Sequence, residues 1–215
     1  TAGAENAVVW VKVPQVDQSV ATDYVYLYYN NSAATAEQDA AGVWPAATGV
    51  YHLGEEPSTT LTPGNIKDSD GSANNGTSFT GMAADDLVIG KIGNALDFDG
   101  DNNDYVGFDS TQFGVGDDNQ NFTISVWVKP DGPVSAINTI LANSAQGASV
   151  DGFRFLINAA GEIRIETAND VGDTGTAESN PSVIVADKWN QITVVIDRSG
   201  SGVGTATIYL NGVNV

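Results

Sequence analysis

The stretch FRFLINAAGEIRIE, residues 153–166, decides the fold. Apolar and polar side chains alternate on both sides of a central Asn-Ala-Ala-Gly turn, which is the pattern of two strands joined as a hairpin. The alternation predicts one apolar face, made of Phe153, Phe155, Ile157, Ile163 and Ile165. A hairpin with one apolar face buries it against a second layer, so we expect two packed layers of β structure.

Further alternating runs lie before and after this hairpin. Residues 122–129, FTISVWVK, form one run that ends at a Pro-Asp-Gly turn, and residues 188–198, KWNQITVVIDR, form another. In the second run, Ile192, Val194 and Ile196 fall on one face. Short strands separated by turn residues are typical of a sandwich, so the sequence predicts an all-β fold, an antiparallel β-sandwich.

The last run, TATIYLNGVNV at residues 205–215, predicts a second hairpin. Its Asn211-Gly212 pair is typical of a two-residue type I′ turn. The returning strand is only three residues long and leaves a sheet edge uncovered. We therefore expect a further segment or another chain to supply missing strands, with a very short natural ending as the alternative.

The first 45 residues have a different pattern. Val8–Val13 and Tyr24–Tyr29 predict two strands, and Ser32–Ala41 is the one helical turn that the pattern suggests, with Ser32 as N-cap. Pro45 separates this region from the next apolar run. The sequence thus predicts a short β-rich segment at residues 1–45 and the main sandwich at residues 49–215.

The composition limits the classes of partner. Lys and Arg number 8 against 27 Asp and Glu, which gives a formal net charge of -19. No basic stripe is available to meet phosphates, so we expect no nucleic acid and no anionic membrane as partner. No run is long enough to insert directly into a membrane. The chain has no cysteine, which excludes disulfides and thiolate metal sites.

A series of motifs resembles a known family. In chain order the motifs are YHLGE (51–55), KDSDGSANNGT (67–77), GKIGNALDFDGDNNDYVGF (90–108), NFTISVWVKP (121–130), DKWNQITVVID (187–197) and ATIYLNGV (206–213). This series resembles the laminin-G-like, concanavalin-A-like jelly-roll domains of bacterial and archaeal surface proteins, over about Gly49–Val215. The resemblance implies two packed antiparallel sheets, usually a calcium ion, and a role in binding glycans or proteins.

The beginning of the chain resembles a second family. VVWVKVP and YLYYNNSAATAEQDA, within Asn6–Trp44, are similar to the C-terminal part of a small β-domain of unknown function. That domain often precedes such jelly rolls in large exported proteins. The resemblance implies a piece of a longer polypeptide that is secreted, displayed at the cell surface or periplasmic.

Two acidic loops are the candidate metal site. One loop carries Asp68 and Asp70, and the other carries Asp99, Asp101 and Asp104. Calcium (Ca²⁺) takes six to eight oxygens from carboxylates and carbonyls, which Asp/Asn/Gly loops supply, but neither loop has EF-hand spacing. Two interpretations stay open, a structural calcium ion and ordinary Asx-turns.

The strongest enzymatic signal is a row of charged residues on one strand. Glu162, Arg164 and Glu166 alternate onto one face. A Glu-x-Asp-x-Glu strand serves laminarinase-type hydrolases of the jelly-roll class, but here Arg164 takes the middle position. A cation between two glutamates opposes the protonated acid that such hydrolysis needs. We therefore predict a solvent-facing ladder of ion pairs rather than a catalytic pair.

The aromatic residues and the single histidine give weaker signals. Trp127 and Trp189 lie within strand patterns, so we expect them to pack. Trp10, Trp44, Tyr51 and Tyr105 lie near loops or boundaries and form no recognisable platform. His52 has no Gly-x-Ser-x-Gly partner, which sets aside a hydrolytic triad.

These observations favour a module that binds without catalysis. We expect an adhesion or recognition module for a glycan or a surface protein, not an enzyme. Two alternatives are a glycoside hydrolase of the same architecture and a structural spacer in a filament or membrane-anchored assembly.

Overall fold

The structure is a computed structural model that describes residues 7–18, 23–100, 104–109, 121–143, 152–168, 174–198 and 204–215. The chain divides into two compact units, Thr1–Gln112 and Phe113–Val215. Described strands pair antiparallel throughout, and the described helical structure is limited to one short α-helix and one 3-10 turn. The predicted all-β class is confirmed.

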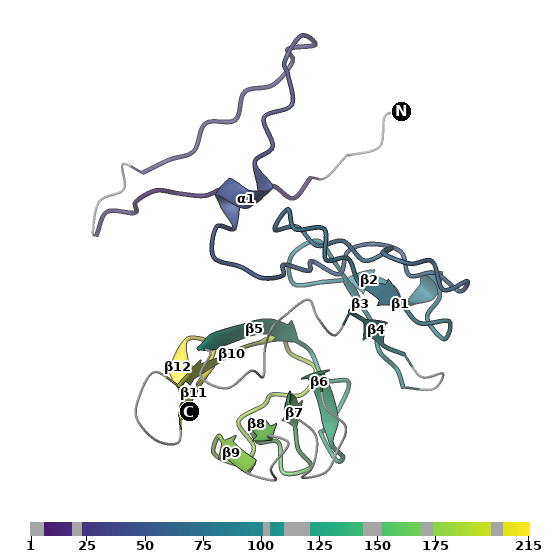
Figure 1. Cartoon of the computed structure of the whole chain (residues 1–215), viewed down its shortest axis with the longest axis vertical. Helices are drawn as coiled ribbons and strands as arrows, with labels where there is room; N and C mark the ends of the chain where they lie inside the picture. Colours follow the sequence, from purple (N-terminus) through teal and green to yellow (C-terminus); the bar gives the residue numbers. More distant parts are fainter. Residues whose placement is uncertain are drawn as a thin grey trace. The chain divides into compact units, whose positions relative to one another are not determined.

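The second unit contains two four-stranded sheets (Figure 1). The first sheet has the order β12-β11-β10-β5 and consists of β5 (Phe122–Val128), β10 (Asn190–Asp197), β11 (Thr205–Leu210) and β12 (Val213–Asn214). The second sheet has the order β6-β7-β8-β9 and consists of β6 (Asn138–Ala142), β7 (Gly152–Ile157), β8 (Ile163–Ala168) and β9 (Thr174–Glu178). The hairpin predicted at residues 153–166 is β7-β8.

A single apolar core joins the two sheets. Its buried members are Phe153, Phe155, Ile157, Ile163 and Ile165 from one sheet and Ile192, Val194, Ile196 and Ile208 from the other. Phe122, Ile124, Val126 and Val128 of β5 pack against them. Burial of these side chains from both sheets is what stabilises the sandwich, at roughly 25 cal/mol for each Å² of apolar surface removed from water. The predicted core face is confirmed.

The last hairpin has the predicted geometry. Asn211 and Gly212 both have positive φ, 50° and 81°, as a type I′ turn requires. The turn sets the register in which Leu210 pairs with Val213 and Tyr209 pairs with Asn214. β12 is the edge strand of its sheet. That further strands complete this edge stays a prediction.

The first unit is built mostly from loops around a small core. Its described elements are α1 (Ala40–Val43), β1 (Thr77–Ser78), η1 (Ala84–Asp86), β2 (Leu87–Ile89), β3 (Asn94–Leu96) and β4 (Val106–Gly107). β1 pairs with β4 and β2 pairs with β3. Ile66, Met82 and Leu96 are buried together, with Tyr51 among the residues packed around them.

Three details of the first unit correct the sequence-based expectations. Val8–Val13 and Tyr24–Tyr29 form no strand in the described structure, and their residues are exposed. The described helix begins after Asp39, whose Oδ1 accepts a 2.9 Å hydrogen bond from Gly42 N–H, and not after Ser32. Strand alternation over residues 95–99 places Leu96 and Phe98 on the core side, but Phe98 is 46% exposed, because β3 ends at Leu96 and the alternation stops there.

Candidate functional site

The first acidic loop is held by hydrogen bonds within the protein. Asp68 Oδ1 accepts hydrogen bonds from the N–H groups of Val50 (2.9 Å) and Asp70 (3.1 Å), and its Oδ2 accepts one from the Ser72 hydroxyl (2.9 Å). Burial acts to raise the pKa of Asp68, but these hydrogen bonds outweigh it and leave that pKa below its usual value. Asp70 is buried and accepts from Ser72 N–H. These are the contacts of Asx-turns, and they satisfy Asp68 without a cation.

The second acidic loop is electrostatically different. Burial, hydrogen bonding with Asp99 and the negative charges of Asp99 and Asp86 together raise the pKa of Asp104, against one hydrogen bond from Gly100 N–H at 3.2 Å. The Oδ1 atom of Asp104 is buried and has no hydrogen-bond partner within the described structure. Carboxylates in such surroundings repel one another, and a cation would relieve that repulsion.

The structure does not assemble the predicted metal ligands into one site. In the part of the chain that is described, no group of three or more Asp, Glu, His or Cys residues is arranged to hold a metal ion. The charges that act on Asp104 come from Asp99 and Asp86 rather than from the first loop. Asp101 lies outside the described residues. A structural calcium ion therefore stays a prediction, and its best-fitting ligands are Asp99 and Asp104.

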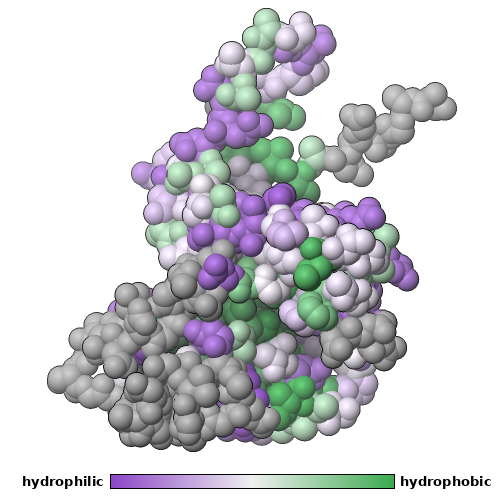
Figure 2. Space-filling view, turned by 45° about the vertical axis from the view of Figure 1, so that its right-hand side comes forward, coloured by the Kyte–Doolittle hydropathy of each residue, from purple (hydrophilic) through white to green (hydrophobic). Residues whose placement is uncertain are grey.

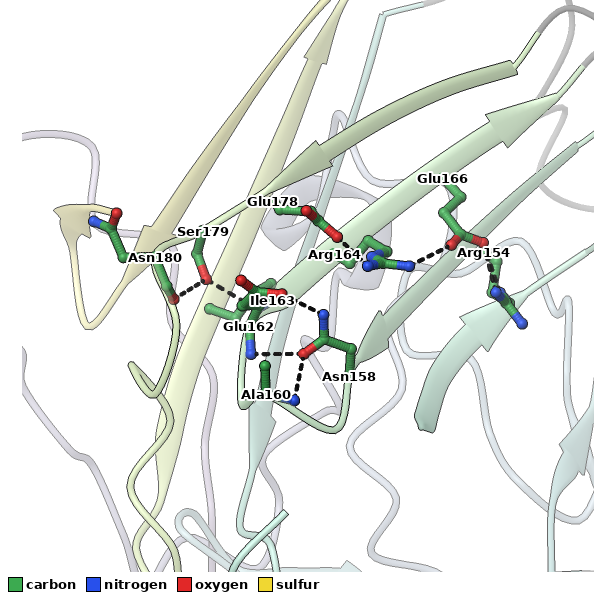
Figure 3. Close-up of polar contacts among 10 residues, drawn as sticks. All are labelled: Arg154, Asn158, Ala160, Glu162, Ile163, Arg164, Glu166, Glu178, Ser179 and Asn180. Carbon is green, nitrogen blue, oxygen red and sulfur yellow. Dashed lines mark hydrogen bonds and ion pairs between the residues drawn. The ribbon is translucent and has the colours of Figure 1, made fainter. Parts of the chain in front are cut away.

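The charged row on β8 forms a chain of ion pairs (Figure 3). Glu166 accepts from Arg154 at 2.7 Å and from Arg164 at 3.2 Å, and Arg164 also pairs with Glu178 of β9. Burial acts to lower the pKa of Arg164, and its two glutamate partners raise it overall. The expected ladder of ion pairs is present, but Glu162 is not part of it. Its members are Arg154, Glu166, Arg164 and Glu178. These surroundings fit a structural network, because two arginines already pair with the Glu166 carboxylate.

Glu162 belongs to a different contact. Asn158 closes the β7-β8 turn, where its Oδ1 accepts from Ala160 N–H (2.9 Å) and from Glu162 N–H (3.1 Å). The Asn158 side-chain amide also donates to the Glu162 carboxylate. Figure 3 shows Glu162 beside Asn158, away from the Arg154–Glu166 end of the row. Glu162 and Glu166 thus serve two separate local networks.

The outer face of the β12-β11-β10-β5 sheet gathers groups suited to binding. Along β5 the exposed Thr123, Ser125 and Trp127 alternate with the side chains that enter the core. Trp127 is 40% exposed, which corrects the expectation that it packs in the core. The register places Trp127 opposite Gln191 and Ser125 opposite Thr193, so these side chains share one face.

These polar side chains form one hydrogen-bonded cluster. Gln191 Nε2 donates to Ser125 Oγ and to Thr193 Oγ1, both at 2.8 Å, and Thr193 Oγ1 donates to Ser125 Oγ at 3.3 Å. On the other side of β10, Tyr209 of β11 lies opposite Thr193. Two aromatic residues thus flank a strip of amide and hydroxyl groups, on strands about 10 Å apart. We call Ser125, Trp127, Gln191, Thr193 and Tyr209 the Trp127 face.

The sequence contained the signal for the Trp127 face. The alternation that sends Ile124 and Val126 inward necessarily sends Ser125 and Trp127 outward. Trp189 is half-buried. In the first unit, Trp10, Trp44, Tyr51 and Tyr105 each lie against another ring. Those pairs are Trp10 with His52 and Trp44, Tyr51 with Phe108, and Phe79 with Tyr105.

The chain belongs to the Concanavalin A-like lectin/glucanases superfamily, whose family description matches residues 98–215. A domain of unknown function, DUF2341, matches residues 1–62. Both predicted resemblances are confirmed. The superfamily name covers lectins, which bind, and glucanases, which hydrolyse, so membership alone leaves both activities open. Among proteins with curated descriptions, none matches the chain.

Several solved structures resemble the fold. The CBM40 of a Ruminococcus gnavus IT-sialidase, bound to α2,3-sialyllactose, is 20% identical with a TM-score of 0.37 over 45% of this chain and 51% of that chain. An S-layer domain-containing protein from Clostridium thermocellum is 26% identical, with a TM-score of 0.48 over 78% of this chain and 70% of that chain. The botulinum neurotoxin serotype G binding domain is 22% identical, with a TM-score of 0.48 over 71% and 36%.

These likenesses are limited in extent. The chain spans about half the length of the first structure and about a third of the third. Each TM-score lies below 0.5. Among the described residues, no helix has the length and apolar character needed to cross a membrane.

Proposed function

We propose that the chain is a non-catalytic glycan-binding module of an exported protein, and that the Trp127 face is its binding surface. One observation carries the proposal: an exposed tryptophan lies beside a hydrogen-bonded amide and hydroxyl cluster on an open sheet face. A sugar ring has an apolar C–H surface that packs on an aromatic ring, and its hydroxyls both donate and accept hydrogen bonds.

The chemistry of this face favours a glycan over a protein partner. Protein interfaces have an apolar, largely uncharged centre with several aromatic anchors. On the Trp127 face the groups next to Trp127 are hydroxyls and amides instead, and Tyr209 is half-buried. Polar groups that already hydrogen-bond to one another are preorganised, which lowers the entropic cost of binding a polar ligand.

Location outside the cytoplasm is part of the same proposal. It is supported by the resemblance to surface-protein domains and by the acidic composition, with a formal net charge of -19. Figure 2 shows hydrophilic and hydrophobic residues mixed over the described part of one face. Fractionation of the native host with an antibody against this chain tests it. Recovery of the parent protein only from the cytoplasm would contradict it.

Screening the whole chain on a glycan array, followed by calorimetric titration of the hits, tests the proposed function. We expect Trp127→Ala to weaken binding by about tenfold or more, which corresponds to ~1.4 kcal/mol. Tyr28→Ala is the matched control, since it removes an 88% exposed aromatic ring from the first unit. Equal binding by wild type and Trp127→Ala would overturn the assignment of the site. Release of reducing sugar from a β-glucan by the wild type would favour the hydrolase alternative.

A further inference from the structure

The outward side chains around the Trp127 face carry almost no formal charge. The outward positions on β5, β10 and β11 are Thr123, Ser125, Trp127, Gln191, Thr193, Val195, Asp197, Thr205, Thr207 and Tyr209. Only Asp197 among them is charged. It pairs in register with Thr205 and lies six residues along β10 from Gln191, roughly 20 Å away. An uncharged surface of this extent is unusual in a chain of net charge -19.

We infer that the Trp127 face binds a neutral glycan directly, without a bridging cation; this inference rests on the proposed function. An anionic sugar is recognised by a cationic side chain, with arginine preferred for carboxylates. A bridging calcium ion needs several carboxylate or carbonyl oxygens at one place. The Trp127 face has neither set of groups, and it has the neutral donors and acceptors that sugar hydroxyls match.

The arginines of the β6-β7-β8-β9 sheet are already engaged. Arg154 and Arg164 lie on the second sheet, where Glu166 and Glu178 pair with them. The two arginines and the two glutamates sum to zero charge, so this chain of ion pairs offers no net attraction to an anion.

One cation lies close enough to need a direct test. Lys129 follows the last residue of β5 and is exposed. Its position two residues after Trp127 continues the outward alternation, although it lies beyond the paired part of the strand. If an anionic ligand bound here, Lys129, just beyond the end of β5, would be a nearby cationic partner. Lys129→Gln therefore separates a neutral ligand from an anionic one.

The test compares matched ligands on the intact chain. An array carries neutral gluco-, galacto-, manno- and xylo-oligosaccharides beside oligogalacturonates and sialylated oligosaccharides of similar length. The best neutral and the best anionic probes are titrated by calorimetry at low and high sodium chloride, with calcium and with EDTA. We expect binding of a neutral probe, a change of less than about twofold between the two salt concentrations, and no loss in EDTA.

The variants give independent outcomes. Trp127→Ala should weaken binding of the neutral probe about tenfold, and Lys129→Gln should leave it unchanged within about twofold. Preference for an anionic probe, loss of affinity in EDTA, or a tenfold loss in Lys129→Gln would overturn the inference while leaving glycan binding at this face intact. Absence of binding to every probe, or binding that Trp127→Ala does not affect, would instead remove the proposed function itself.

Discussion

The indole ring of Trp10 lies flat against the imidazole ring of His52, with ring centroids 4.7 Å apart and an angle of 7° between the planes. Trp44 completes a triangle of rings, 5.5 Å from Trp10 and 6.2 Å from His52. Trp10 comes from an N-terminal segment that forms no strand within the described residues. The aromatic triangle is therefore one contact between that segment and the rest of the first unit.

This stack predicts a stability that depends on pH. Burial lowers the pKa of His52 below its usual value of 6.5, and the charge of Glu55 opposes part of that shift. Folding thus favours the neutral imidazole, so its contribution to stability is complete above about pH 6.5 and is lost as pH falls through the folded-state pKa. Thermal unfolding followed by tryptophan fluorescence should show a steeper loss between pH 6.5 and 5 for wild type than for His52→Phe. Identical slopes would contradict the prediction.

The two acidic loops should respond to calcium differently. Asp104→Asn removes like-charge repulsion, so in chelator we expect it to be at least as stable as wild type. Asp68→Asn should lose about 1 kcal/mol, because an amide accepts fewer of the hydrogen bonds that Asp68 receives. If calcium binds, it raises the melting temperature of wild type but not that of Asp104→Asn. If calcium does not shift the melting temperature of the wild type, the prediction of a structural calcium ion is wrong.

The ion pairs on the second sheet should contribute to stability and not to binding. Glu166→Gln breaks contacts with Arg154, whose side chain is only 14% exposed, and with Arg164. We expect a loss of about 1 kcal/mol in the free energy of unfolding, since the network is partly buried. Urea denaturation measures this loss, and titration with the glycan probe should give an unchanged Kd. A large loss of binding would place the functional surface on this sheet instead.

A pair of phenylalanines tests the described core. Phe155 is fully buried between the sheets, whereas Phe98 is 46% exposed. Phe155→Ala should cost about 3–5 kcal/mol, and Phe98→Ala should cost less than about 1 kcal/mol because a half-exposed ring loses less burial. Comparable losses in urea denaturation would show that Phe98 packs as the strand pattern first suggested.

The final turn offers a test of backbone geometry alone. Gly212 has φ of 81°, and a Cβ added there would meet no atom within 4 Å. Gly212→Ala therefore adds only the strain of the left-handed conformation, about 1 kcal/mol. Thermal unfolding should detect this loss. A neutral Gly212→Ala would argue against the type I′ turn.

The sequence was most informative where burial decides the structure. Alternation in residues 153–166 and 188–198 identified the core faces, because the two-residue period of a strand leaves each side chain one choice of face. It was least informative in the first unit. There the described strands are two or three residues long, too short for a period to be recognised, and isolated contacts such as the Tyr51–Asp68 bridge carry the fold.

At the Trp127 face, the position of a residue in its strand predicts its orientation better than its residue type does. Its place within a strand pattern predicts that Trp127 packs, but the alternation along that same strand puts Trp127 outward with Ser125. The sequence alone does not identify Gln191 and Thr193 as site residues, because their place beside Trp127 depends on which strand pairs with β10. Their pairing with β5 is a matter of topology, which local pattern does not determine. The domain limits at residues 45 and 49 remain predictions.

The two sheets of the sandwich have different outer faces. The chain of ion pairs lies on β7, β8 and β9, and the Trp127 face lies on β5, β10 and β11. On the outer face of the β6-β7-β8-β9 sheet Leu156 is fully buried, whereas the side chains of Arg164, Glu166 and Glu178 stay 27–36% exposed. The Trp127 face displays hydroxyl and amide groups that hydrogen-bond to one another. A module of this kind repeated along a polypeptide would present its ligands to one side only, and the rotation between successive copies would then determine how many can engage a single surface at once.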